Sequence, residues 1–377
     1  MLGAFAAEST HLMEKQRLQW LDALRGFTML MVVTNHVYGI GFATNTKYSM
    51  FMSLCLLFRM PLFFFIRGFL AYKASFSWSV RDTGALVLKK LRVQIIPTVV
   101  FMTAQIALFA KVFWDRMAEA WQSPTKGGYW FTMVLLQMFL IYYLVCWTIS
   151  LLPSREGSGV RPASASSPSL REGLGVGLLW LLAVFAYATM YMPRSFTWPK
   201  EYFWRVTSIT ELARDFQFFL LGNLVHRYWR QVQRLFDTTW FVPLIIVVAF
   251  LGAGDYLKWH NLRMEWANLP RTLAMYALVL LTVAFFRHYA EWFSNERRVG
   301  RVLQYVGVRT LDVYLIHFFF IPKLPEVGVW LKAHPQNFII EGTSAFLVAS
   351  LVVAFSLFTS QVLRVSPFLK KWLFGRG

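Results

Sequence analysis

LDALRGFTMLMVVTNHV, residues 21–37, is an apolar stretch that nevertheless carries Asp22, Arg25 and His36. Its composition predicts a helix that crosses a membrane. Arg25 and His36 project from one face of such a helix, roughly 16 Å apart along its axis, and Asp22 lies one turn before Arg25. Ionisable side chains are costly at membrane depth and usually mark a functional pathway. The stretch therefore indicates both a fold class and a candidate site.

The rest of the chain has the composition of a membrane protein. Hydrophobic residues make up 57% of it, aromatic residues 18% and charged residues only 15%. Several apolar runs reach the length of roughly 20 residues that a helix needs to cross a bilayer. We therefore predict a single all-α domain over residues 1–377, a polytopic bundle of about ten transmembrane helices. The expected spans are residues 22–41, 50–72, 93–113, 129–152, 174–192, 208–226, 239–257, 270–287, 304–321 and 338–364.

The net charge of +19 does not indicate nucleic acid as a partner. The basic residues flank apolar spans, and no basic patch interleaved with aromatic residues is found on a polar segment. If the N-terminus is cytoplasmic, Lys and Arg are more frequent in the segments that face the cytoplasm than in those outside. This bias predicts that both termini are cytoplasmic.

One segment differs from the rest. Residues 153–177, PSREGSGVRPASASSPSLREGLGVG, are dominated by Ser, Gly, Pro and Arg. Such a composition buries too little apolar surface to order itself, so we predict a disordered cytoplasmic loop insert there. Cys55 and Cys146 both lie in apolar runs, which favours buried free thiols over a disulfide or a metal site. The sequence gives no indication of the oligomeric state.

Arg25 and His36 are the first candidates for chemistry. A guanidinium near the cytoplasmic surface suits a phosphate-bearing ligand. An imidazole deeper in a dry pocket suits proton transfer to or from a hydroxyl group. The alternatives are that Arg25 reaches the membrane surface and pairs with Asp22, and that His36 is hydrogen-bonded to a neighbouring helix.

Three further groups are candidates for ligand contacts. Tyr314 and His317 are neighbours on one helical face, and His317 is expected at the depth of His36. Arg67 lies near the inner end of its span, where it either reaches the surface, pairs with an acid or holds a phosphate. Glu211 and Asp215 lie near the outer end of theirs, as an interfacial ion-pair cluster or as the entry for a polar acceptor. A P-loop, a GxGxxG fingerprint, an HExxH zinc motif and a nucleophile elbow are all absent from the sequence.

Three stretches resemble acyltransferase family 3, a family of integral-membrane enzymes that acylate glycans and other acceptors. LDALRGFTMLMVVTNHV is similar to the family's pattern of a basic residue, ten residues and a histidine, matched here by Arg25 and His36. MPLFFFIRGFLAYK (60–73) is similar to a phenylalanine run that ends in Ser-Gly-Phe. VGVRTLDVYLIHFFF (306–320) is similar to the family's late segment with Gly, Ser or Thr, Tyr-Leu and His.

The resemblance implies an acyl-CoA donor, acetyl-CoA by family frequency with succinyl as an alternative, and a hydroxyl acceptor on a glycan or other molecule. It implies that His36 is catalytic, as a general base or as a transient acyl carrier, with Arg25 as its essential partner. The CoA phosphates are then expected at Arg25, Arg67 and Arg92, and Tyr314, His317, Glu211 and Asp215 at the substrate. We expect no metal, and we expect a multi-pass protein in the lipid of the bacterial inner membrane.

The chain departs from the family pattern at two places. Arg67 stands where a serine is usual, and Leu91 and Gln94 occupy the positions of two arginines before Pro97. Two other functions therefore stay open. A transporter would use the same polar groups along a translocation path, although its expected internal repeats are not evident. A member that has lost catalysis would only bind a glycan or lipid.

Overall fold

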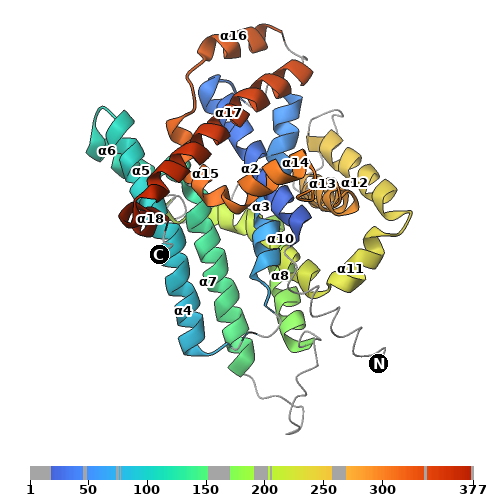
Figure 1. Ribbon diagram of the computed structural model, residues 1–377. Coiled ribbons are helices and arrows are strands. Elements are labelled where there is room, and N and C mark those ends of the chain that lie inside the picture. Colours follow the sequence, from blue (N-terminus) through green and yellow to red (C-terminus); the bar gives the residue numbers. More distant parts are fainter. Residues whose placement is uncertain are drawn as a thin grey trace.

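The computed structural model describes residues 18–45, 49–73, 76, 78–151, 170–190, 203, 206–256, 269–334 and 338–374. Over these residues the protein is all-helical, without strands (Figure 1), which confirms the predicted all-α class. The helices of the first half are α2 (Gln19–His36), η1 (Val37–Gly41), α3 (Met50–Ala71), α4 (Val80–Lys90), η3 (Leu91–Ile95), α5 (Ile96–Phe109), α6 (Phe113–Gln122), η4 (Lys126–Gly128), α7 (Trp130–Leu151) and α8 (Leu170–Met190). Those of the second half are α10 (Ile209–Arg227), α11 (Trp229–Phe236), α12 (Phe241–Tyr256), α13 (Leu269–His288), α14 (Arg298–Val308), α15 (Thr310–Ile316), η5 (His317–Phe319), α16 (Pro325–Ala333), α17 (Phe338–Val365) and α18 (Pro367–Phe374).

A helix occupies each predicted span, but not every one of these helices is long and apolar enough to cross a membrane. Five helical segments among the described residues are long and apolar enough to cross a bilayer: Phe51–Ala71, Val80–Phe109, Trp130–Leu151, Leu269–His288 and Ile339–Val365. A sixth is possible if α11 and α12, which are bent by 84° at their junction, form one broken span. The predicted count of ten and the cytoplasmic position of the termini therefore remain predictions.

α2 is the central helix of the bundle, and it is not among the five. It packs against α3, α13, α14, α15 and α17, and most of its residues are buried (Figure 1). The outer helices instead expose large apolar side chains, among them Phe109, Phe185, Phe250 and Phe358. An apolar exterior around a core that contains charged residues is the arrangement expected of a helix bundle surrounded by lipid.

Some helices touch backbone to backbone, and glycines make this contact possible. A Cβ atom on Gly26 of α2 would lie 1.9 Å from the carbonyl oxygen of Leu303 in α14, and one on Gly307 would lie 1.8 Å from that of Asp22. α3 and α10 meet in the same way, because a Cβ on Gly68 would lie 1.7 Å from the oxygen of Phe219. Small residues at such crossings are the usual means of close helix packing in membranes.

The predicted loop insert at 153–177 needs a correction at its end. α8 begins at Leu170, so residues 170–177 are helical, while 153–169 lie outside the described residues. The glycines that favoured a loop are used for packing. A Cβ on Gly173 would lie 2.1 Å from the hydroxyl of Tyr228, and one on Gly175 would lie 2.2 Å from the side chain of Ile149.

The predicted span at 304–321 is not one continuous helix. α14 ends at Val308 and α15 begins at Thr310, because Arg309 between them has φ −113° and ψ 19°, outside the helical region. α15 then tightens into the 3₁₀ turn η5. This break and this turn set the position of His317.

Candidate active site

Two histidines from opposite ends of the sequence meet in the core. His36 is the last residue of α2 and His317 is the first residue of η5. His36 Nδ1 lies 2.8 Å from His317 Nε2. The ring centroids are 5.1 Å apart and the ring planes differ by 11°. Together these values describe nearly coplanar rings that meet edge to edge through a hydrogen bond.

The two histidines differ in what else they contact. His317 is fully buried, and its Nδ1 lies 3.0 Å from the carbonyl oxygen of Val313 and 2.8 Å from that of Tyr314. His36 is partly exposed, and its Nε2 makes no hydrogen bond to any described residue. His36 is therefore the member of the pair that a substrate can reach.

Aromatic residues form the wall beside the pair. The ring of Phe318 lies 5.1 Å from that of His36 and 5.2 Å from that of Tyr129. Tyr314, predicted at the substrate, uses its hydroxyl for the protein itself: it donates to the oxygen of Gly128 at 2.8 Å and accepts from the amide of Phe131 at 3.2 Å. The hydroxyl of Tyr314 thus links α15 to the start of α7 through hydrogen bonds.

Arg59 of α3 is a cation beside His36 that the sequence analysis did not select. Its Nη1 lies 3.5 Å from the carbonyl oxygen of Val32, one turn before His36, and it is close enough to interact electrostatically with the imidazole. Its Nε is buried without a hydrogen-bond partner, and no carboxylate of the described residues forms an ion pair with it. The available signal was its place inside an apolar span, two helical turns before Arg67.

Beyond Arg59 lies a cluster that contains both predicted acidic residues. Asp215, which is fully buried, accepts from Arg214 Nη2 at 2.6 Å, and its Oδ1 has no hydrogen-bond partner. Glu211 Oε2 is also buried without such a partner. Both acids interact electrostatically with Arg214, and Asp215 and Arg214 interact with Arg59. The cluster is thus continuous with the surroundings of His36.

Lys126, in η4 beside this cluster, is buried and donates to the carbonyl oxygens of Trp121 and Ser123, each at 2.8 Å. Burial lowers the pKa of its ammonium group, and the negative charge of Glu211 partly opposes that shift.

Three cations gather at the opposite end of α2, and we call Arg25, Arg67 and Lys90 the cationic cluster. Arg25 Nη1 lies 2.8 Å from Asp22 Oδ1. Arg67 is close enough to Arg25 and to Lys90 for mutual repulsion. Its Nη2 lies 3.3 Å from the hydroxyl of Thr310. Among the described residues no carboxylate forms an ion pair with Arg67 or Lys90, so this end of the bundle has an excess of positive charge.

Arg92, the third predicted donor contact, is exposed to the surroundings and is not part of this cluster. Lys90 takes its place: its Nζ lies 3.6 Å from the ring centroid of Phe139. Arg92 belongs to the basic run KKLR, residues 89–92, only part of which can face the bundle from one helix, and the sequence did not show which residue does.

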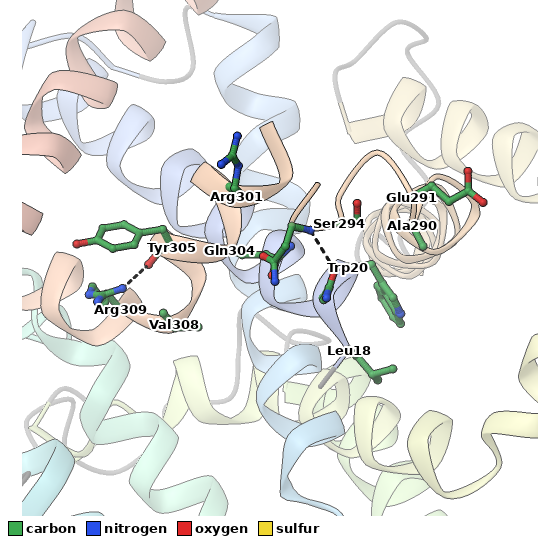
Figure 2. Close-up of a pocket in the computed structure, with 12 residues that line it drawn as sticks. Leu18, Trp20, Ala290, Glu291, Ser294, Arg301, Gln304, Tyr305, Val308 and Arg309 are labelled. Carbon is green, nitrogen blue, oxygen red and sulfur yellow. Dashed lines mark hydrogen bonds between the residues drawn. The ribbon is translucent and has the colours of Figure 1, made fainter. Parts of the chain in front are cut away.

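A separate hollow of about 890 Å³ lies at the N-terminal end of α2, between α14 and the segment that follows α13 (Figure 2). Its lining includes Trp20, Glu291, Arg301 and Arg309 but neither histidine nor any member of the cationic cluster. Arg309 is engaged with Tyr305, whose ring centroid lies 3.9 Å from the guanidinium carbon.

The comparison with known families assigns the chain to one of them. The sequence profile described as an acyltransferase domain, that of acyltransferase family 3, matches residues 18–364. This is nearly the whole chain, so the protein belongs to that family and is a membrane acyltransferase. No curated protein and no solved structure matches it.

Proposed function

We propose that this enzyme transfers an acyl group, in the first place acetyl, from acyl-CoA to a hydroxyl group of a glycan or another polar acceptor. His36 acts as the general base. The observation that carries the proposal is the environment of His36: its Nε2 is free of hydrogen bonds to the described residues, the side chain is partly exposed, and Arg59 interacts with both His36 and Asp215.

The cationic cluster suits the donor. Arg67 and Lys90 are partly buried cations that form no ion pair with a carboxylate of the described residues. Such cations favour a bound anion, and the phosphates of CoA are such anions. Arg25 and His36 lie on one face of α2, roughly 16 Å apart along its axis. The thin pantetheine arm of CoA then extends along this face and brings the thioester toward His36.

The chemistry follows from the surroundings of His36. Its Nε2 takes the proton of the acceptor hydroxyl while the hydroxyl oxygen attacks the thioester carbonyl carbon. The carbon–sulfur bond then breaks, and the CoA thiolate takes the proton from the imidazolium of His36. Arg59, with a buried unpaired Nε, is placed to stabilise the negative charge that develops on the carbonyl oxygen.

The acceptor belongs on the other side of Arg59. Glu211 and Asp215 each have a carboxylate oxygen without a hydrogen-bond partner, which suits the hydroxyl groups of a sugar. We propose that Tyr314 and His317 position other residues of the site and do not contact the substrate directly. Their polar atoms are already hydrogen-bonded within the protein. The expected location is the bacterial inner membrane, with the acceptor in the cell envelope.

The test is release of free thiol from acetyl-CoA by membrane fragments that contain the protein and its native acceptors. His36→Gln is expected to lower the rate by about 10²- to 10⁴-fold, the usual contribution of general acid–base catalysis. His334→Gln, at an exposed histidine whose ring stacks on Trp330, is the matched control and is expected to leave the rate unchanged. Full activity of His36→Gln would refute the proposed role, and thiol release absent from the unaltered protein would favour the transporter or the non-catalytic binder.

A further inference from the structure

We infer that His317 is a positioning residue that fixes the tautomer of His36 and presents Nε2 of His36 as the reactive base. The inference rests on the proposed function and adds a second histidine to it. Three steps of geometry lead to it.

The first step concerns the proton on His317. Its Nδ1 lies within hydrogen-bond distance of two carbonyl oxygens, those of Val313 and Tyr314. A carbonyl oxygen only accepts hydrogen bonds, so Nδ1 must carry the hydrogen. The neutral imidazole has one N–H, and Nε2 of His317 is therefore an acceptor.

The second step transfers this constraint to His36. The 2.8 Å contact joins His317 Nε2 to His36 Nδ1. Because the nitrogen on His317 accepts, Nδ1 of His36 must donate and carries the hydrogen. The lone pair of neutral His36 is then on Nε2, which has no hydrogen-bond partner among the described residues. The reachable nitrogen is thus the basic one.

The third step concerns the charge that forms during reaction. When Nε2 of His36 takes the substrate proton, the positive charge is stabilised through Nδ1–H by the lone pair of His317. Two carbonyl oxygens in turn hold the far side of the His317 ring. The groups that would oppose a positive charge on His36 are Arg59 from α3 and a protonated His317, so the role of His317 requires its neutral form, with the lone pair on Nε2.

The fold makes this role specific to position 317. His317 directly follows the C-terminal end of α15, and its Nδ1 reaches the carbonyl oxygens of the residues three and four positions earlier. The ring is also held by Phe318, whose centroid lies 4.0 Å away. His317 has no exposure, so it acts through His36 and not on the substrate.

The test compares two replacements. His317→Gln places an amide oxygen near the former position of Nε2, where it accepts from His36 Nδ1–H, whereas His317→Leu has similar bulk and no acceptor. We expect His317→Leu to lower kcat for thiol release from acetyl-CoA by about 10²-fold with KM unchanged. His317→Gln is expected to recover most of kcat. Equal loss in both variants, or kcat of His317→Leu within twofold of the unaltered protein, would overturn the inference.

A spectroscopic measurement gives an independent reading. The chain has seven histidines, so ¹⁵N-histidine labelling gives few signals, and the His36→Gln variant identifies those of His36. We expect Nδ1 of His36 to be protonated and Nε2 unprotonated in the unaltered protein, with this preference lost in His317→Leu. A protonated Nε2 would overturn the inference even if His36 were essential, whereas full activity of His36→Gln would overturn the proposed function first.

Discussion

At the scale of single residues, the main feature is positive charge inside an apolar bundle. Arg59, Arg67 and Lys90 all lack a carboxylate partner among the described residues, although unpaired charges are costly to bury. A protein retains such groups where a ligand or a transition state supplies the opposite charge. The first two predictions test these two cases separately.

Arg67→Met is expected to raise KM for acetyl-CoA about tenfold with little change in kcat, because it removes one charge-assisted hydrogen bond to a phosphate, of about 1.5 kcal/mol. Lys90→Met is expected to act alike. Arg92→Met is the matched control, since Arg92 is exposed and lies outside the cationic cluster. Steady-state thiol release at several salt concentrations measures this, and a KM raised equally by all three variants would contradict the assignment.

Arg59→Gln is expected to lower kcat by about 10²-fold and to leave KM for acetyl-CoA nearly unchanged, because it removes one donor to the developing oxyanion. Arg116→Gln, at an exposed arginine paired with Glu119, is the control for a general loss of positive charge. The same thiol-release assay separates the two constants. An altered KM with an unaltered kcat would instead place Arg59 at the donor.

The sequence predicted that His36 and His317 lie at a similar depth, but it did not predict the side chains that surround them. Hydrophobic patterning and helical periodicity put His36 and His317 at comparable depth, and the two rings are hydrogen-bonded. Periodicity does not give the rotation of one helix relative to another. It therefore could not show that Arg59 faces His36, that Lys90 replaces Arg92, or that the hydroxyl of Tyr314 is taken by the backbone.

At the scale of helices, two crossings hold the polar groups in register. Gly26 follows Arg25, and Gly68 follows Arg67, so each member of this arginine pair precedes a point where two backbones touch. The crossing of α2 with α14 and the crossing of α3 with α10 therefore fix the height of both guanidinium groups in the bundle. The apolar runs predicted these helices, but not the break at Arg309, because nothing in the composition around it differs from a continuous helix.

Gly26→Ala and Gly68→Ala are each expected to destabilise the protein by about 1–3 kcal/mol, because the added methyl group meets a carbonyl oxygen that cannot move without displacing a helix. Gly84→Ala in α4 is the matched control, since a Cβ there meets nothing within 4 Å. Thermal unfolding in detergent, followed by loss of the monodisperse chromatographic peak, measures the difference. A melting temperature of Gly68→Ala equal to that of Gly84→Ala would contradict these close contacts.

At the scale of the whole molecule, the groups proposed to bind the donor and the acceptor lie at different heights along the bundle. α2 carries the cationic cluster at one end and the histidine pair at the other, and the cluster of Asp215 lies beyond Arg59. α6 and α16 lie at one end of the bundle and α11 lies toward the opposite end (Figure 1). A donor that enters from the cytoplasm and an acceptor in the cell envelope require that the cationic cluster face inward, as the predicted orientation has it.

Cysteine accessibility tests this orientation directly. The native Cys55 and Cys146 are buried, so a membrane-impermeant maleimide has little native background. Gln122→Cys, at the exposed end of α6, is expected to be labelled in intact spheroplasts. Gln231→Cys, exposed on α11, is expected to be labelled only after the membrane is opened, because the excess of Lys and Arg places that segment in the cytoplasm. The reverse pattern would put the cationic cluster on the side without acyl-CoA, and the donor would then have to bind elsewhere.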